Sequence, residues 1–167
     1  MAPSESEHSW LCFRVANSEY AIPLSDVAEV SAGRSRHLIP TLSLEVGGVI
    51  NLRGEPLPAL DGGLLLIGVI SRSSRHVLVL ERGRVRVGLF VDAVLRMVHE
   101  MSRELVEKSP DADEVPGEVR SACFAERLRK RGGKIRLVDS DALIGRAVAL
   151  MSDAVNMEGE GRCQTLS

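Results

Sequence analysis

Aromatic residues are scarce in this chain, at 3% of 167 residues, although 44% of the residues are hydrophobic. The core must therefore consist of Val, Leu, Ile and Ala side chains, and few rings are left for a surface that stacks on bases. The formal net charge of -2 also provides no general basic field that would attract nucleic acid or an acidic membrane. We therefore expect no nucleic-acid partner, and we expect partners to be recognised by local features.

Patterns for metals, disulfides and export are also missing. Three cysteines are scattered without a CxxC spacing: Cys12, Cys123 and Cys163. Four histidines stand apart, in contexts typical of surface or strand-end residues: His8, His37, His76 and His99. We predict no metal site, no cofactor and a reducing compartment. The polar start "MAPSESEHSW" and the short apolar stretch "LLLIGVI" predict a cytoplasmic chain without direct membrane insertion.

The sequence contains little that indicates catalysis. Four aspartates could supply paired carboxylates, but each follows a strand or starts a helix, where aspartate commonly caps backbone N–H groups: Asp61, Asp92, Asp139 and Asp141. Neither GxGxxG nor GxxxxGK[ST] occurs, and the basic groups "RGRVR" and "RLRKRGGK" fall at solvated hairpin turns. We predict that the protein is not an enzyme. A small β-barrel hydrolase or metal-dependent enzyme using Asp61 or Asp92 is the alternative from another class.

Alternating apolar residues and glycine turns predict a series of hairpins. The paired segments are "LCFRV" with "EYAIPL", Gly47 to Leu60, "HVLVLE" with "VRVGLFVD", and "SACFAERL" with "KIRLVD". Because proline cannot donate to a ladder, Pro56 and Pro58 predict an edge strand or one that is broken early. No βαβ alternation occurs, so the expected fold class is mainly β, in small antiparallel barrels.

Helical patterns are few. Ser25 as an N-cap, with Val27 and Val30 three residues apart, predicts one or two helical turns over residues 25–30. Ser140 is expected to cap a C-terminal helix with one apolar stripe: Leu143, Ile144, Ala147, Val148 and Met151. We expect flexible tails at residues 1–8 and 154–167, one domain of two subdomains over residues 9–153, and a solvated acidic linker over 100–118.

Four segments, in order, resemble the CheW family of chemotaxis coupling proteins: "EYAIPLSDVAEV", "GGVINLRGEPLPALD", "VGLFVDAVLRMV" and "KIRLVDSDALI". The resemblance implies two intertwined five-stranded β-barrels packed together, with short helices. It implies a non-enzymatic adaptor that couples the cytoplasmic tips of chemoreceptors to the regulatory domain of a CheA-type histidine kinase, in arrays that reach the membrane through its partners. The alternative is a CheW-like adaptor of a non-flagellar pathway governing surface motility, development or second-messenger output, with altered partner contacts.

The resemblance also assigns candidate site residues. Arg53 occupies the arginine of the "NLRG" motif and, with Asn51 and Val27, is expected to bind the receptor. Glu29, in "VAEV", is expected to contact the kinase or another partner. From the residues alone, an exposed turn residue is the favoured interpretation of Arg53, and Val27 could as well pack at a barrel end. Two segments depart from the family pattern, "SACFAERL" and the glycine pair in "ALDGGLLLIG", and these changes bear on which partners fit.

Overall fold

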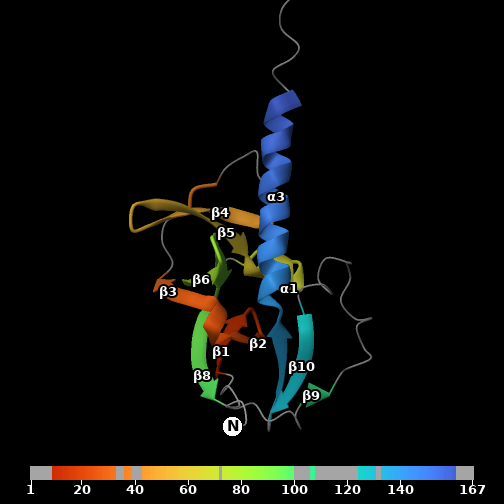
Figure 1. Cartoon of the computed structure of the whole chain (residues 1–167). Coiled ribbons are helices and arrows are strands. Elements are labelled where there is room, and N and C mark those ends of the chain that lie inside the picture. Colours follow the sequence, from red (N-terminus) through yellow and green to blue (C-terminus); the bar gives the residue numbers. More distant parts are fainter. Residues whose placement is uncertain are drawn as a thin grey trace, which may run out of the picture.

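The computed structural model describes residues 9–32, 36–38, 43–71, 73–99, 106–107, 124–130 and 133–160. Two β-sheets and a long C-terminal helix make up the described fold, as Figure 1 shows. The predicted mainly β fold class is therefore confirmed, and the strands form two sheets. In the described residues the backbone ladders leave both sheets open, with six and five strands, instead of closing them into two five-stranded barrels.

The first sheet combines the beginning and the end of the chain in the strand order β8-β1-β2-β11-β10-β9. β2 pairs with β11 in parallel, and the other neighbours are antiparallel. Its strands are β1 (Ser9–Val15), β2 (Ser18–Pro23), β8 (Ala93–His99), β9 (Val106–Glu107), β10 (Phe124–Lys130) and β11 (Gly133–Val138).

The second sheet contains the middle of the chain in the order β3-β6-β7-β5-β4. Its strands are β3 (Val27–Ala32), β4 (Val46–Leu52), β5 (Glu55–Asp61), β6 (His76–Arg82) and β7 (Val85–Val91). β5 lies inside the sheet, so the prediction of an edge strand is wrong for the strand as a whole. Its proline half nevertheless pairs only with β4, because β7 meets β5 at Ala59, Leu60 and Asp61.

A single main core joins the sheets and the last helix. Buried side chains from both sheets pack with the apolar face of α3 (Ser140–Glu160), including Phe13, Tyr20, Leu78, Leu89 and Leu143. In Figure 1, α3 leaves the end of the first sheet and runs alongside the second. Burial of this apolar surface, which contributes about 25 cal/mol per Å², stabilises the packing of the two sheets and α3 against one another. None of the helices in the described ranges is long and apolar enough to cross a membrane.

The short helix predicted over residues 25–30 is wrong. A single 3-10 turn, η1 (Leu24–Asp26), is followed directly by β3, which runs antiparallel to β6. The three-residue spacing of the valines matches a helix and not the two-residue period of a strand. Pairing with the strongly β-forming β6 nevertheless makes this segment a strand, since tertiary context overrides local propensity.

The last helix differs from expectation at three points. Asp139 caps it, because its Oδ1 accepts the Ala142 N–H at 3.1 Å, and the Ser140 hydroxyl instead donates elsewhere. Val148 is 41% exposed and Leu150 takes the place expected for it in the buried stripe. The helix continues past residue 153 to Glu160.

The strand β8 and the helix α1 (Gly62–Ile67) were not expected from the sequence. Residues 1–8 and most of the linker over 100–118 lie outside the described residues, apart from the two of β9.

Candidate functional site

Arg53 occupies an unusual backbone position in the turn between β4 and β5. Its φ is +54° and that of Gly54 is +92°, as a two-residue type I′ hairpin turn requires at both central positions. A non-glycine residue in this region costs about 1 kcal/mol or more. The Asn51 side chain supports the turn, because its Oδ1 accepts the Gly54 N–H at 2.7 Å. Asn51 and Arg53 are therefore joined in one local structure.

The Arg53 side chain reaches across the sheet to β3. Its Nη2 lies 3.0 Å from Oε2 of Glu29, with 79% of the Arg53 side chain exposed and 21% of the Glu29 side chain. β3 and β4 are the two end strands of this sheet, so the ion pair bridges its two open ends. Figure 1 shows the tip of the β4–β5 hairpin on the same side of the molecule as β3.

The strand β3 presents alternating faces. Val27 and Glu29 are half-buried, Ala28 and Val30 are exposed, and Val27 packs against the main core. The packing interpretation of Val27 is therefore correct, while Glu29 on the same strand is paired with Arg53. The structure thus brings Arg53, Asn51 and Glu29 together, with Val27 one alternation along β3. Their roles in binding partners remain predictions.

The two aspartates considered for catalysis lie at the ends of neighbouring parallel strands. Asp61, which is 1% exposed, accepts N–H groups of Leu64 and Ser71 at 3.0 and 3.3 Å. Its Oδ2 also lies 3.5 Å from Nη1 of Arg36, whose guanidinium sits 4.0 Å over the Phe90 ring. Asp61 is the N-cap of α1, as the position of aspartates before helices predicts.

Asp92 fastens two segments of the chain. Its Oδ2 accepts the Ala16 N–H at 2.6 Å, and its Oδ1 accepts the Ser71 hydroxyl. Both carboxylates therefore accept hydrogen bonds from backbone and loop groups. In this arrangement they serve a structural role, and they do not form an open catalytic pair. Within the described residues, no group of three or more His, Cys, Asp or Glu side chains could hold a metal ion.

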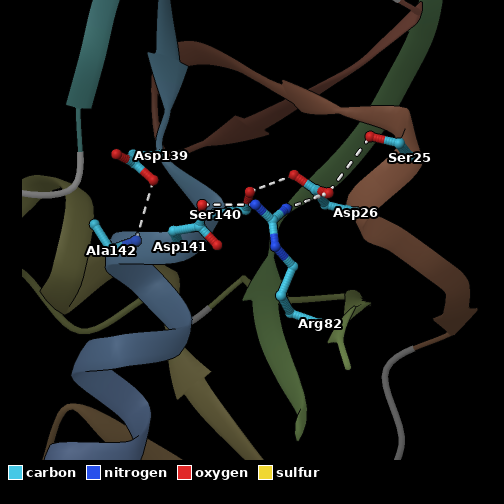
Figure 2. A network of polar contacts seen from close by, with 7 residues as sticks. All are labelled: Ser25, Asp26, Arg82, Asp139, Ser140, Asp141 and Ala142. Carbon is cyan, nitrogen blue, oxygen red and sulfur yellow. Dashed lines mark hydrogen bonds and ion pairs between the residues drawn. The ribbon is translucent and has the colours of Figure 1, made fainter. Parts of the chain in front are cut away.

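A second polar network lies where the two sheets and α3 meet (Figure 2). Asp26, at the end of η1, is 8% exposed. Its carboxylate accepts a hydrogen bond from Nη1 of Arg82 at 2.8 Å and another from the Ser140 hydroxyl. Nη2 of Arg82 lies 2.7 Å from Asp141 Oδ2. Neither Asp26 nor Arg82 belongs to the site expected from the sequence. The sequence signal for a buried site was a charged residue, Asp26, within an apolar segment. The helix expected over residues 25–30 explained Asp26 as a residue of the first helical turn instead.

Comparison with known proteins fits the fold and these motifs. The family model described as "CheW-like domain" matches residues 9–148. The chain belongs to the CheW-like domain family. The resemblance noted in the sequence is therefore confirmed, and the protein belongs with those of chemotaxis-type signalling.

Three curated relatives extend the comparison. A probable chemotaxis protein CheW of Rhizobium etli is 27% identical over 65% of this chain and 70% of its own length. The chemotaxis protein CheW of Rhizobium meliloti is 32% identical over 60% of this chain, and the match spans 66% of that relative. Protein PilI of Pseudomonas aeruginosa is 35% identical over 59% of this chain, and the match spans 57% of PilI.

A solved structure has the same fold. The crystal structure of the scaffolding protein TtCheW from Thermoanaerobacter tengcongensis superposes with a TM-score of 0.68 at 22% sequence identity. The superposition covers 83% of this chain and 88% of TtCheW. At this identity the likeness concerns the arrangement of strands and helices alone.

Proposed function

We propose that this CheW-like protein is a non-enzymatic adaptor that couples chemoreceptor cytoplasmic tips to the regulatory domain of a CheA-type histidine kinase. The observation that carries the proposal is the pairing of Arg53 with Glu29 beside the turn held by Asn51. It gives the motif arginine a defined place on the surface. The proposed location is the cytoplasm, at receptor arrays reached through these partners.

The chemistry of Arg53 suits recognition of a helical receptor tip. A guanidinium offers five N–H donors in a planar fork, and Glu29 engages one of its nitrogens. Since 79% of the side chain is exposed, donor capacity remains for a carboxylate or backbone carbonyl of a partner. Glu29 restricts the rotamers of Arg53 before binding, which lowers the entropy lost on association. Asn51 acts by holding the turn on which Arg53 stands.

The strand β3 offers a surface for the second partner. It is the end strand of its sheet in the described part of the chain, and it carries Glu29 with Val30, which is 45% exposed. Consecutive strand residues point to opposite faces, so Val30 offers an apolar contact for the kinase regulatory domain on the exposed face, and Glu29 lies on the face of Val27. Val27 supports this surface from the core side and touches a partner only through its exposed part.

A second candidate within the same adaptor class is coupling in a non-flagellar chemosensory pathway. It is supported by PilI, the relative with a name other than CheW and the highest identity of the three. In that case one of the two partner contacts is altered. The fold and the Arg53 site are the same in both candidates.

Co-sedimentation with each partner separately tests the proposal. The purified protein is mixed with a receptor signalling-tip fragment in one arm and with the kinase regulatory domain in the other. Binding in both arms is expected for a coupler, and binding in one arm alone supports the altered adaptor. Absence of binding in both arms, with a protein that melts cooperatively, contradicts the proposal.

A further inference from the structure

Asp26 lies at the junction of the two sheets. It ends η1, which connects β2 of the first sheet to β3 of the second, and the residue is 8% exposed. A carboxylate removed from water in this way is stable only when its oxygens are paired. Both oxygens of Asp26 are engaged, Oδ1 by Nη1 of Arg82 and Oδ2 by the hydroxyl of Ser140.

These partners come from distant parts of the chain. Arg82 is the last residue of β6, and Ser140 is the first residue of α3. Arg82 also binds Asp141 in the first turn of α3, so one guanidinium holds two carboxylates, as Figure 2 shows. The network therefore ties η1 to both the second sheet and the C-terminal helix.

The position of Asp26 in the sequence connects this network to the proposed binding surface. Its neighbours Leu24 and Val27 pack against the main core, which fixes the start of β3 on both sides. The register of β3 against β6 shifts between Val27 and Glu29. From Glu29 to Ala32 the pairing with β6 is regular, so β6 holds Glu29 on one side of the irregularity. The anchored start of β3 holds the other side and limits how far this pairing can shift.

We propose that Asp26 is a positioning residue for the Arg53 site: it anchors the start of β3, through Arg82 and Ser140, so that Glu29 holds Arg53 in the orientation that binds a partner. This inference rests on the proposed receptor contact of Arg53. Asp26 itself touches no partner. Its loss changes the geometry of Glu29 and of the Arg53 guanidinium, and through them the affinity.

The test compares Asp26→Asn with Asp92→Asn. Both changes remove one carboxylate charge from a hydrogen-bonded aspartate, but Asp92 serves Ala16 and Ser71 and not β3. Affinity for a receptor signalling-tip fragment is measured by titration calorimetry at a temperature where all variants are folded. We expect Asp26→Asn to bind at least about five-fold more weakly and Asp92→Asn to bind like the wild type. Ser140→Ala, a milder change at the same network, should show a smaller loss in the same direction.

A second measurement does not depend on the partner. NMR signals of the Glu29 amide and of the Arg53 Nε–H should shift in Asp26→Asn and stay in place in Asp92→Asn. A merely structural Asp26 would lower stability without this difference. Unmoved Glu29 and Arg53 signals overturn the inference, as does equal weakening of binding by both variants at equal loss of stability.

The inference and the proposed function fail in different ways. If Arg53→Glu binds the receptor tip like the wild type, the proposed receptor site is wrong, and the NMR comparison alone decides on the positioning role of Asp26. If Arg53→Glu abolishes binding while Asp26→Asn leaves it intact, the receptor site stands and the inference is wrong. In the double variant, Asp26→Asn should add no further loss to that of Arg53→Glu.

Discussion

The guanidinium of Arg53 and the carboxylate of Glu29 lie 3.0 Å apart. The pair links the turn that follows β4, at one end of the five-stranded sheet, to β3 at the other end. The backbone ladder does not close this sheet in the described residues, and the side chains span the opening instead. The pair is mostly open to solvent on the arginine side, so its contribution to folding is small, about 0 to 1 kcal/mol. Its importance lies in fixing where the cation stands.

Removing the side chain of Arg53 should leave stability nearly unchanged. Arg53→Gly loses the exposed ion pair but relieves the left-handed backbone at φ +54°, and the two effects largely cancel, within about 1 kcal/mol. Asn51→Ala should lower the free energy of unfolding by about 1 kcal/mol, since the Gly54 N–H loses its acceptor. Urea unfolding followed by the fluorescence of Trp10, the only tryptophan, measures both. A loss above about 2 kcal/mol for Arg53→Gly would show that the pair is mainly structural.

Two glycines should respond oppositely to alanine. A Cβ on Gly63 would lie 2.2 Å from the Val69 carbonyl oxygen and 2.6 Å from the Ser71 nitrogen, both backbone atoms that cannot move away cheaply. Gly63→Ala should therefore destabilise the protein by about 2 kcal/mol or more. Gly145, inside α3, meets nothing within 4 Å, and Gly145→Ala should stabilise by about 0.5 to 1 kcal/mol. Thermal melts of the two variants check the pair, and equal midpoints would contradict the packing described around Gly63.

Asp61 should be among the most sensitive polar residues for stability. Asp61→Ala leaves two backbone N–H groups and Arg36 without their buried acceptor, and we expect a loss of about 3 kcal/mol. Glu55→Ala is the control, because its side chain is 77% exposed and its change should stay within about 0.5 kcal/mol. Urea midpoints compare the two. A small effect of Asp61→Ala would reopen a functional role for this carboxylate.

The hairpins were predictable from the sequence because their signals are local. Alternating apolar residues in "HVLVLE" and "VRVGLFVD", around a turn with Gly83 at φ +60°, specify β6 and β7 without tertiary information. The Asp61 cap was also predictable, since Asp61 stands at the start of α1. At α3 the sequence indicated Ser140, whereas Asp139 is the cap, because the Ser140 hydroxyl donates to Asp26. The parallel joining of β2 to β11 was not, because it depends on segments more than a hundred residues apart.

The candidate site was only partly predictable. Motif similarity named Arg53, Asn51, Val27 and Glu29 separately, but no sequence pattern indicates that Arg53 and Glu29 form a pair, since it depends on how the sheet curls. Asp26 was assigned to a helix because Val27 and Val30 have a helical spacing, which the pairing of β3 with β6 overrides. Its actual partners, Arg82 and Ser140, become visible only once both sheets and α3 are in place.

Alkaline pH should unfold the protein together with ionisation of Tyr20. Desolvation by burial raises the pKa of Tyr20 above its ordinary value of 10.0, against smaller lowering effects of Arg136 and Ser18. A raised folded pKa means that the folded state keeps its proton longer than the unfolded state does. This contribution to stability is therefore complete below pH 10.0 and is lost as the pH rises further.

Tyrosinate absorbance can follow this directly, because Tyr20 is the only tyrosine of the chain. The absorbance of the folded protein should begin to rise above pH 10.0 and should rise together with unfolding. Tyr20→Phe should remove most of the stability change in this range. A full titration centred at pH 10.0 in the folded protein would contradict the burial effect.

The role of Arg53 in receptor binding is measured by the receptor-tip affinity of Arg53→Glu, with kinase-domain affinity determined on the same preparation. Reversing a hydrogen-bonded interfacial charge commonly costs about 2 to 5 kcal/mol, roughly thirty-fold or more in affinity. The exchange variant Arg53→Glu with Glu29→Arg keeps an ion pair and serves as the control for the fold. We predict that both variants lose the receptor tip, that Arg53→Glu retains the kinase domain, and that both melt cooperatively. Wild-type affinity of Arg53→Glu for a cognate receptor tip would contradict it and leave Arg53 as a solvated turn residue.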